Sequence, residues 1–479
     1  MKWQTYFLLL LAIFFFSSPA SAEEFIVNNE HQLQTVLETA VEHDTVTIKE
    51  GIYKGNFTVN MPMTIKGEEG ATIIGPNKGD VITVNADDVT IENLQIEGSG
   101  SQNAGIHVNG NRSVLKNNKL YNVFHGIVVK KSYGHQIEHN AITSYLDKNL
   151  HKGHGIYLIE APHSIIGNNT IFNTNDGIYL SYSNSSEISR NIVSKTRYGI
   201  HTMDSVDVVI YQNEATQNRN GLMIMQSKRV LIKENYLYAN TTVEGAGIFL
   251  FDTFDSTILT NIIKKNNKGI YFENGIRNTI TFNEFDENDK GMEIGKDSDE
   301  NQIYLNNFLN NNEQIITDKK NENVFSRDGF GNYWDDQYHL KMDRNEPTIY
   351  ASVCTSNPAQ LQQYNRDETN AYAYKSGDVF YHLTTSQPYL QLFSGSPAVR
   401  LWNTIEQFVP IPSKQFIVDE YPIQMPVVIE PEFEKMNTNE QNLSEVNSAV
   451  NVKKGGFFLS FMSLSFLILW MTRRMKNDA

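Results

Sequence analysis

The chain has 479 residues, a formal net charge of −15 at pH 7 and a single cysteine. The excess of acidic residues and the absence of Lys/Arg blocks argue against a nucleic-acid partner. Cys354 has no second cysteine to pair with, so an internal disulfide is excluded and stability has to come from packing.

The first 22 residues are typical of a signal peptide. Lys2 supplies the positive start, residues 6–16 form an apolar run, and Ala20-Ser21-Ala22 is a small-residue cleavage site. We therefore expect an exported protein.

Residues 30–43 carry apolar side chains at helical spacing, at Leu33, Val36, Leu37 and Val41. A helix here would cap the open end of the strands that follow it and cover their unpaired edge groups. The first strands are expected at residues 44–48, 64–65, 72–74, 81–84 and 89–96.

Nine repeats organise the middle of the chain. Each has a glycine with mostly aliphatic residues one and three positions later, and the usual step is 22 residues. The glycines are Gly105, Gly126, Gly155, Gly177, Gly199, Gly221, Gly247, Gly269 and Gly291. A fixed period in the twenties indicates a solenoid, in which each repeat buries its apolar face against its neighbours. Because the apolar residues alternate as in strands, the sequence predicts an all-β parallel β-helix over residues 23–326, most regular at about 105–310.

An asparagine precedes most of these glycines at one corner of the repeat, usually by eight residues, and Asn306 closes the series. The series is Asn118, Asn140, Asn169, Asn191, Asn213, Asn235, Asn261, Asn283 and Asn306. Stacked amides can hydrogen-bond from coil to coil, so we expect a structural ladder. Asparagine tolerates left-handed torsions, and we expect it to turn this corner; the glycines are likewise expected to have positive φ.

One outward face of the predicted helix is unusually apolar. Residues two and four positions after each glycine point outward, and in the middle coils they are aromatic, Met and His. An apolar patch of this extent marks a docking surface, unless the C-terminal segment folds back over it. The candidate docking residues are Tyr157, Tyr179, Phe249, Phe251 and Tyr271.

His201 and Met203 occupy this face in one coil, and Met223 and Met225 hold the same columns of the next. Neighbouring coils lie about 4.8 Å apart, so these four donors can converge. Thioether and imidazole ligands suit Cu(I), which predicts a copper site. The alternative is methionine as adaptable apolar filler in an interface.

A second candidate metal or acid–base site lies one position before the glycines. His125, His154 and Asp176 fall there in successive coils, and His151 lies nearby in an insertion. Two histidines and a carboxylate can bind a metal or move protons. Scattered surface histidines are the alternative.

Beyond the repeats the period is lost, and residues 327–426 gain prolines and aromatics, which favours a C-terminal cap and wrapping segment. Residues 427–455 are polar and resemble a flexible linker. Residues 456–472 are almost wholly apolar and are followed by basic residues, which predicts a transmembrane anchor with 473–479 as a cytoplasmic tail. The protein is then expected to be extracytoplasmic and anchored to the cytoplasmic membrane.

Polysaccharide-processing β-helices need paired carboxylates, or acidic calcium ligands beside a basic residue. The apolar face has almost no acids, and Glu273 and Glu293 stand only at its far end. We therefore predict a protein that is not an enzyme. Binding or processing of a surface polysaccharide is the alternative, and a structural adhesin is a third possibility.

The stretch Gly331-Asn332-Tyr333-Trp334-Asp335-Asp336 resembles the terminal motif of the right-handed β-helix proteins of the NosD family. Later stretches resemble that family's C-terminal region, and they are Ser396-Pro397-Ala398, Phe408–Pro410, Val418–Pro422 and Met425-Pro426. Residues 341–347 replace an acidic, glycine-rich loop common in the family, so a calcium loop is not expected there.

The resemblance implies an accessory protein for the maturation of nitrous oxide reductase. Such a protein works with an ABC transporter and aids copper delivery to the reductase's copper–sulfide centre. A copper chaperone would be a further partner.

Overall fold

The computed structural model describes residues 22–145, 150–295, 297–317, 322–336 and 417–430, with short pieces between 349 and 401. The predicted signal peptide (except residue 22), the predicted anchor and tail, and residues 431–455 of the predicted linker lie outside the described residues. The chain divides into two units, Met1–Pro431 and Glu432–Ala479, and every described residue belongs to the first. No helix in the described part is both long enough and apolar enough to cross a membrane.

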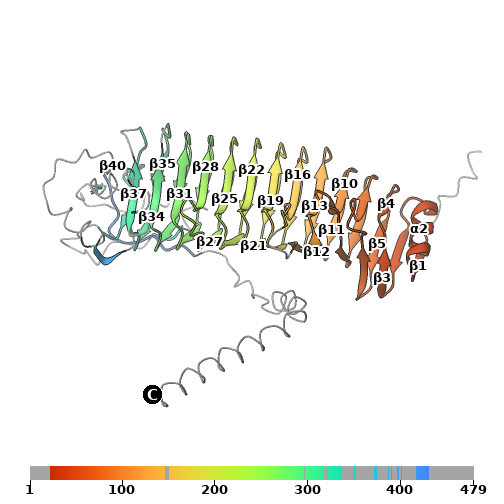
Figure 1. The fold of residues 1–479 in the computed structure, drawn as a ribbon. Coiled ribbons are helices and arrows are strands. Elements are labelled where there is room, and N and C mark those ends of the chain that lie inside the picture. The colour runs from red at the N-terminus through yellow and green to blue at the C-terminus, as the bar shows by residue number, and fades with distance from the viewer. Residues whose placement is uncertain are drawn as a thin grey trace, which may run out of the picture. The chain divides into compact units, whose positions relative to one another are not determined.

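The described chain is a right-handed parallel β-solenoid of about 14 turns. Its coils stack from α2 at the N-terminal end to β37 near the other end, and each coil adds one strand to each of three sheets (Figure 1). Aliphatic side chains from all three sheets fill the interior as one continuous core. The predicted fold class is thus confirmed for the solenoid.

The first sheet has 13 strands: β1 Glu24–Val27, β2 Thr45–Ile48, β5 Thr64–Gly67, β8 Thr90–Glu92, β11 Val114–Lys116, β14 Gln136–Glu138, β17 Ile165–Gly167, β20 Glu187–Ser189, β23 Val209–Tyr211, β26 Leu231–Lys233, β29 Thr257–Leu259, β32 Thr279–Thr281 and β35 Gln302–Tyr304. The second sheet has 12: β4 Phe57–Val59, β7 Ile82–Val84, β10 Ala104–Val108, β13 His125–Lys130, β16 Ile156–Ile159, β19 Asp176–Ser181, β22 Tyr198–Met203, β25 Asn220–Met225, β28 Ala246–Phe251, β31 Lys268–Glu273, β34 Lys290–Ile294 and β37 Glu313–Thr317. The third has 13: β3 Gly51–Lys54, β6 Ala71–Ile74, β9 Gln95–Glu97, β12 Lys119–Val123, β15 Ala141–Ser144, β18 Thr170–Phe172, β21 Ile192–Ser194, β24 Glu214–Thr216, β27 Tyr236–Tyr238, β30 Ile262–Lys264, β33 Glu284–Asp286, β36 Asn307–Leu309 and β38 Tyr333–Trp334. A short antiparallel pair, β39 Tyr372–Tyr374 and β40 Ile417–Asp419, forms a separate two-stranded sheet.

The predicted N-terminal helix is present as α2, Glu30–Thr39. Asn29 caps it by accepting a hydrogen bond from the Gln32 backbone N–H, and Leu33 and Leu37 are buried against the first coils. The helix ends earlier than the predicted residue 43 because the backbone becomes extended at Ala40.

The asparagine ladder is confirmed, and all nine members are buried. At each step the backbone N–H and the side-chain amide both donate to the Oδ1 of the next asparagine, as Asn191 does to Asn213 at 3.0 and 2.9 Å. The ladder ends on Asn332, which accepts from Asn306. The expected left-handed torsion was misplaced: it belongs to the residue before each asparagine, such as Gln212 with φ 54°. Each ladder asparagine instead faces the next coil with both its backbone and side-chain N–H groups.

A second ladder, which the sequence patterns did not reveal, runs through Asn218, Asn240, Asn266, Asn288 and Asn311.

The expectation of positive φ at the repeating glycines was wrong. None of the nine has a left-handed backbone; the glycines are required by close packing in the strands of the second sheet or, for Gly155, directly before one. A Cβ on Gly177 would lie 2.2 Å from Val193 Cγ1 and 2.5 Å from the carbonyl oxygen of Gly199 in the next coil. The same crowding against the following coil recurs at the other eight glycines.

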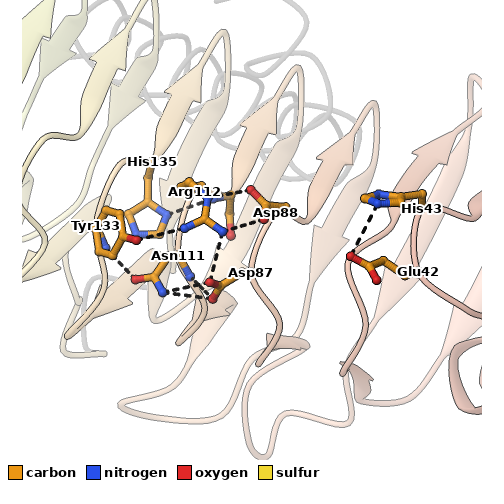
Figure 2. Close-up of polar contacts among 9 residues, drawn as sticks. Glu42, His43, Asp87, Asp88, Asn111, Arg112, Tyr133 and His135 are labelled. Carbon is orange, nitrogen blue, oxygen red and sulfur yellow. Dashed lines mark hydrogen bonds and ion pairs between the residues drawn. The ribbon is translucent and has the colours of Figure 1, made fainter.

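Left-handed residues along another corner form a charged ridge of Asp–Arg pairs from successive or nearby coils: Asp88 with Arg112, Asp207 with Arg229, and Asp255 with Arg277. Figure 2 shows the first pair, in which Arg112 also donates to the Tyr133 hydroxyl at 3.0 Å. These pairs are substantially exposed, so solvent screens them and each contributes little to the stability of the fold.

The terminal motif around Trp334 and the later stretch around Asp419 meet at the end of the solenoid. Trp334 in β38 stacks on Phe308 with ring centroids 4.4 Å apart, so the third sheet continues past the predicted boundary at residue 326. The Asp419 carboxylate accepts hydrogen bonds from the Trp334 indole at 3.0 Å and from the Asn332 backbone N–H at 2.7 Å. Burial raises the pKa of Asp419 to about 6. Val427 is buried and exchanges hydrogen bonds with Asn307, so the packed chain also extends past the predicted linker boundary at 426.

Candidate metal site on the second sheet

The strands β19, β22, β25, β28 and β31 lie side by side in the second sheet and bring the predicted columns together. His201 pairs with Met223, and Met203 pairs with Met225, across β22 and β25. Both columns continue into aromatic residues, because Met223 pairs with Phe249 and Met225 with Phe251. Residues one repeat apart therefore stand next to one another on one face of the sheet, as predicted.

The two ring nitrogens of His201 face different partners. Nδ1 lies 3.1 Å from the Asp176 Oδ2 atom, and Nε2 lies 3.3 Å from the Met225 sulfur. The other two sulfurs also have polar neighbours: the Tyr179 hydroxyl donates to Met203 Sδ at 3.4 Å, and the Asn220 amide donates to Met223 Sδ at 3.6 Å.

The four side chains lie at two depths. His201 and Met223 are 5% and 4% exposed, whereas Met203 and Met225 are half-buried. The site thus has a buried imidazole and thioether, with two thioethers nearer to solvent.

Asp176, at the start of β19, has no exposed surface. Arg197 binds both of its carboxylate oxygens, with Nε 2.8 Å from Oδ1 and Nη2 2.7 Å from Oδ2. Burial by itself would raise the pKa of Asp176, but the hydrogen bonds from His201 and Arg197 outweigh it and lower the pKa below its usual value. The guanidinium of Arg197 also lies 4.5 Å above the ring of Tyr198.

Three residues of the second candidate site lie in the cluster around His201, and they are His125, His154 and Asp176. The His154 backbone N–H donates to His125 Nδ1 at 2.9 Å, and His154 Nδ1 lies 3.6 Å from Asp176 Oδ2. Burial lowers the pKa of His125 to about 3 and that of His154 to about 4, so both are neutral at pH 7. His151 is exposed, and no hydrogen bond or ion pair found among the described residues joins it to the other three. Within that described part, no group of three or more His, Cys, Asp or Glu side chains is arranged to hold an ion.

The candidate docking residues are half-buried, and each of their rings contacts a neighbouring ring on this face. Tyr179 stacks on His154 with centroids 5.2 Å apart and planes 26° apart, and Phe249 lies 4.6 Å from Tyr271. Other ring pairs on this face meet edge to face, such as Phe249 and Phe251 with planes 88° apart.

Sequence reasoning missed the role of Arg197 in this cluster. Arg197 precedes β22, two positions before the repeating glycine Gly199, and that position lies outside the columns that the repeat singled out. It also missed a similar carboxylate–imidazole pair elsewhere on this face, in which His107 Nδ1 lies 2.8 Å from Asp80 Oδ2.

Known proteins resemble this chain in both sequence and fold. A family model described as "Periplasmic copper-binding protein (NosD)" matches residues 136–338. The chain is 32% identical over 408 residues to a probable ABC transporter binding protein NosD of Pseudomonas aeruginosa, covering 80% of this chain and 89% of the relative. A protein with the same description from Stutzerimonas stutzeri is 31% identical over 395 residues, covering 78% and 85%.

Among solved structures, the A-module of the Azotobacter vinelandii mannuronan C-5 epimerase AlgE6 matches with a TM-score of 0.52 and 11% identity, covering 64% of this chain and 98% of the module. The AlgE4 A-module gives a TM-score of 0.51, also at 11% identity. At this identity the likeness shows the β-helix fold alone. The long matches to the curated relatives show more than that: the chain belongs to the NosD family.

Proposed function

We propose that this protein carries Cu(I) on His201, Met203, Met223 and Met225 during the maturation of nitrous oxide reductase. It aids delivery of copper to the reductase's copper–sulfide centre, together with an ABC transporter. Membership of the NosD family supports a role in the nitrous oxide reductase system and an extracytoplasmic location. In this proposal copper is the cargo of the protein and is bound only transiently.

The observation that carries the proposal is the 3.3 Å approach of His201 Nε2 to the Met225 sulfur. For comparison, an imidazole nitrogen and a thiolate sulfur on one zinc ion, with bonds of about 2.1 and 2.3 Å at a tetrahedral angle, stand about 3.6 Å apart. The two atoms thus already have nearly the separation that a shared ion requires. Met203 and Met223 pair with Met225 and His201 in the sheet and can supply the remaining ligands.

The chemistry of the donors selects the ion. Thioethers and imidazole bind soft or borderline cations, and the thioether set favours Cu(I) over hard cations. A thioether has no proton to lose and a neutral imidazole keeps one lone pair, so neither type of ligand requires the deprotonation that a thiol requires. Transfer to a partner is favoured by the two half-buried methionines, because an incoming ligand can reach them first.

Both curated relatives are named as ABC transporter binding proteins, which supports such a partner for this chain. We place the contacts with the transporter, the reductase and a copper chaperone on the half-buried aromatic residues on either side of the copper ligands, Tyr157, Tyr179, Phe249, Phe251 and Tyr271. Copper would then pass at the centre of the docked surface.

The test is an anaerobic Cu(I) competition titration of the full-length chain against a chromogenic chelator. The variant replaces His201 with Asn and the three methionines with Leu, which keeps side-chain volume nearly constant. The matched control carries Met61→Leu and His139→Asn, outside the site. Loss of Cu(I) binding in the site variant alone supports the proposal. Equal affinity in wild type, site variant and control would leave the methionines as interface filler.

The polysaccharide alternative finds less support in the site. A sugar ring stacks on an exposed aromatic face, but the aromatic residues here are half-buried and contact one another, as Tyr179 does His154. Assays for reducing ends or unsaturated products on a panel of uronans are expected to stay silent. Turnover in those assays would favour the alternative.

A further inference from the structure

The buried carboxylate of Asp176 connects the two sets of histidines that the sequence singled out. Its Oδ2 atom lies 3.1 Å from His201 Nδ1 and 3.6 Å from His154 Nδ1. Only the first of these is a hydrogen-bond distance, and His154 Nδ1 has no hydrogen-bond partner in the part of the chain that the structure describes. The carboxylate therefore binds His201 and leaves His154 aside.

Arg197 fixes the orientation of this carboxylate. Its guanidinium makes two parallel hydrogen bonds to the two oxygens, at 2.8 and 2.7 Å, and this fork restrains the plane of the carboxylate. The positive charge also compensates the buried negative charge, which would otherwise be costly. With both oxygens engaged, the remaining acceptor site on Oδ2 faces His201.

This contact determines which nitrogen of His201 carries the proton. An ionised carboxylate only accepts hydrogen bonds, so Nδ1 must be the protonated nitrogen. In the neutral ring, Nε2 then holds the lone pair, and Nε2 is the atom that lies 3.3 Å from Met225 Sδ. The nitrogen available to an ion is thus the one that faces the thioether.

We infer that Asp176, held in place by Arg197, is the positioning residue of the Cu(I) site: it fixes His201 in the Nδ1–H tautomer and directs the Nε2 lone pair toward the methionine sulfurs. The inference rests on the proposed copper function. Carboxylates that orient a metal-binding imidazole from behind typically contribute about 10–100-fold to metal affinity. Neither Asp176 nor Arg197 is expected to touch the ion.

The variant Asp176→Asn tests this inference, because the amide keeps the shape of the carboxylate but can donate as well as accept. Leaving Arg197 without an anion would destabilise the protein for unrelated reasons. A second variant therefore combines Asp176→Asn with Arg197→Gln, which removes both charges together. Thermal unfolding of both variants identifies any general loss of structure.

The first readout needs no metal. Imidazole ¹⁵N NMR of the full-length chain, labelled at its 12 histidines, reports which ring nitrogen carries the proton, and His201→Asn identifies the His201 signals. We expect a single Nδ1–H tautomer in the wild type and a mixture in both Asp176 variants. A wild-type ring that is already a mixture would overturn the inference.

The second readout is the Cu(I) competition titration. Both Asp176 variants are expected to bind Cu(I) about 10–100-fold more weakly than the wild type. If the wild type binds Cu(I) and both variants keep its affinity, the positioning role is refuted while the proposed function stands. If the wild type binds no Cu(I), the proposed function fails, and the inference about a copper site fails with it, whatever the tautomer.

Discussion

The asparagine ladder offers the sharpest test of how the solenoid is held together. Asn213 lies in its middle and is fully buried. Its amide donates to the carbonyl oxygens of Ile188 and Tyr211 at 2.8 and 3.0 Å and to Asn235 Oδ1 at 3.0 Å. Its own Oδ1 accepts the backbone N–H and the side-chain amide of Asn191. The perturbation is Asn213→Ala, which removes all five hydrogen bonds at once.

The magnitude follows from which groups lose their only partner. Within the described residues the Asn191 backbone N–H has no other acceptor than Asn213, and an orphaned buried N–H costs about 1–3 kcal/mol. The Asn191 side-chain amide keeps the carbonyl oxygens of Ile166 and Ser189. The carbonyl oxygens of Ile188 and Tyr211 each lose one hydrogen bond, and about 1 kcal/mol for each brings the total to roughly 3–5 kcal/mol.

Because a solenoid's stability is a sum of coil and neighbour contributions, this loss should be local. Hydrogen–deuterium exchange of the full-length chain measures it, and 3 kcal/mol corresponds to about a 100-fold loss of protection. The matched control is Asn109→Ala, an exposed asparagine with one hydrogen bond to Asn85. Peptides containing Asn191 should lose protection in the ladder variant only. Equal exchange of these peptides in the two variants would refute the reasoning.

Three further predictions concern other parts of the fold. Gly177→Ala places a Cβ 2.2 Å from Val193 Cγ1. Overpacking of this kind costs about 1–3 kcal/mol or more, so the thermal unfolding midpoint should fall. An unchanged midpoint would count against the packing role of the repeating glycines. Burial lowers the pKa of His135 to about 4, so the stability it contributes is complete above about pH 6.5 and is lost as the pH falls toward 4, by about 3 kcal/mol. Urea unfolding should therefore show that the free energy of unfolding falls less at acid pH in His135→Asn than in the wild type. Parallel pH profiles of the two proteins would contradict this. Asp419→Ala removes the carboxylate that accepts a hydrogen bond from the Trp334 indole N–H. Limited proteolysis should therefore cut within residues 417–430 faster than in the wild type. Equal rates of cleavage would argue against this carboxylate as the anchor of the C-terminal segment.

Much of the fold could be predicted from the chain because its signals are periodic. A 22-residue step places His201 beside Met223, and the structure has this register. The asparagine column was predicted in the same way, since identical side chains at identical places in successive coils must stack. The N-terminal helix followed from the spacing of its apolar residues, and the resemblance of the terminal motifs agreed with the family that the relatives show.

Local geometry within one coil was harder to predict. The position of the left-handed residue was misjudged by one place, because asparagine's tolerance of this conformation is a preference, and here hydrogen bonding to the next coil prevails. The glycines were explained by turn geometry, although a carbonyl group in the following coil excludes a side chain. Neither effect has a signature in composition or spacing.

The sequence by itself determined the solenoid, its ladder and the columns that bring sulfur and imidazole onto one face, because all of these depend only on a repeat length. Only the tertiary structure decided that Asp176 binds His201 and Arg197, and that Asp419 closes on Trp334 across 85 residues. Those contacts run diagonally between columns or between distant segments, where no period relates the partners and only the packed chain brings them within hydrogen-bonding distance.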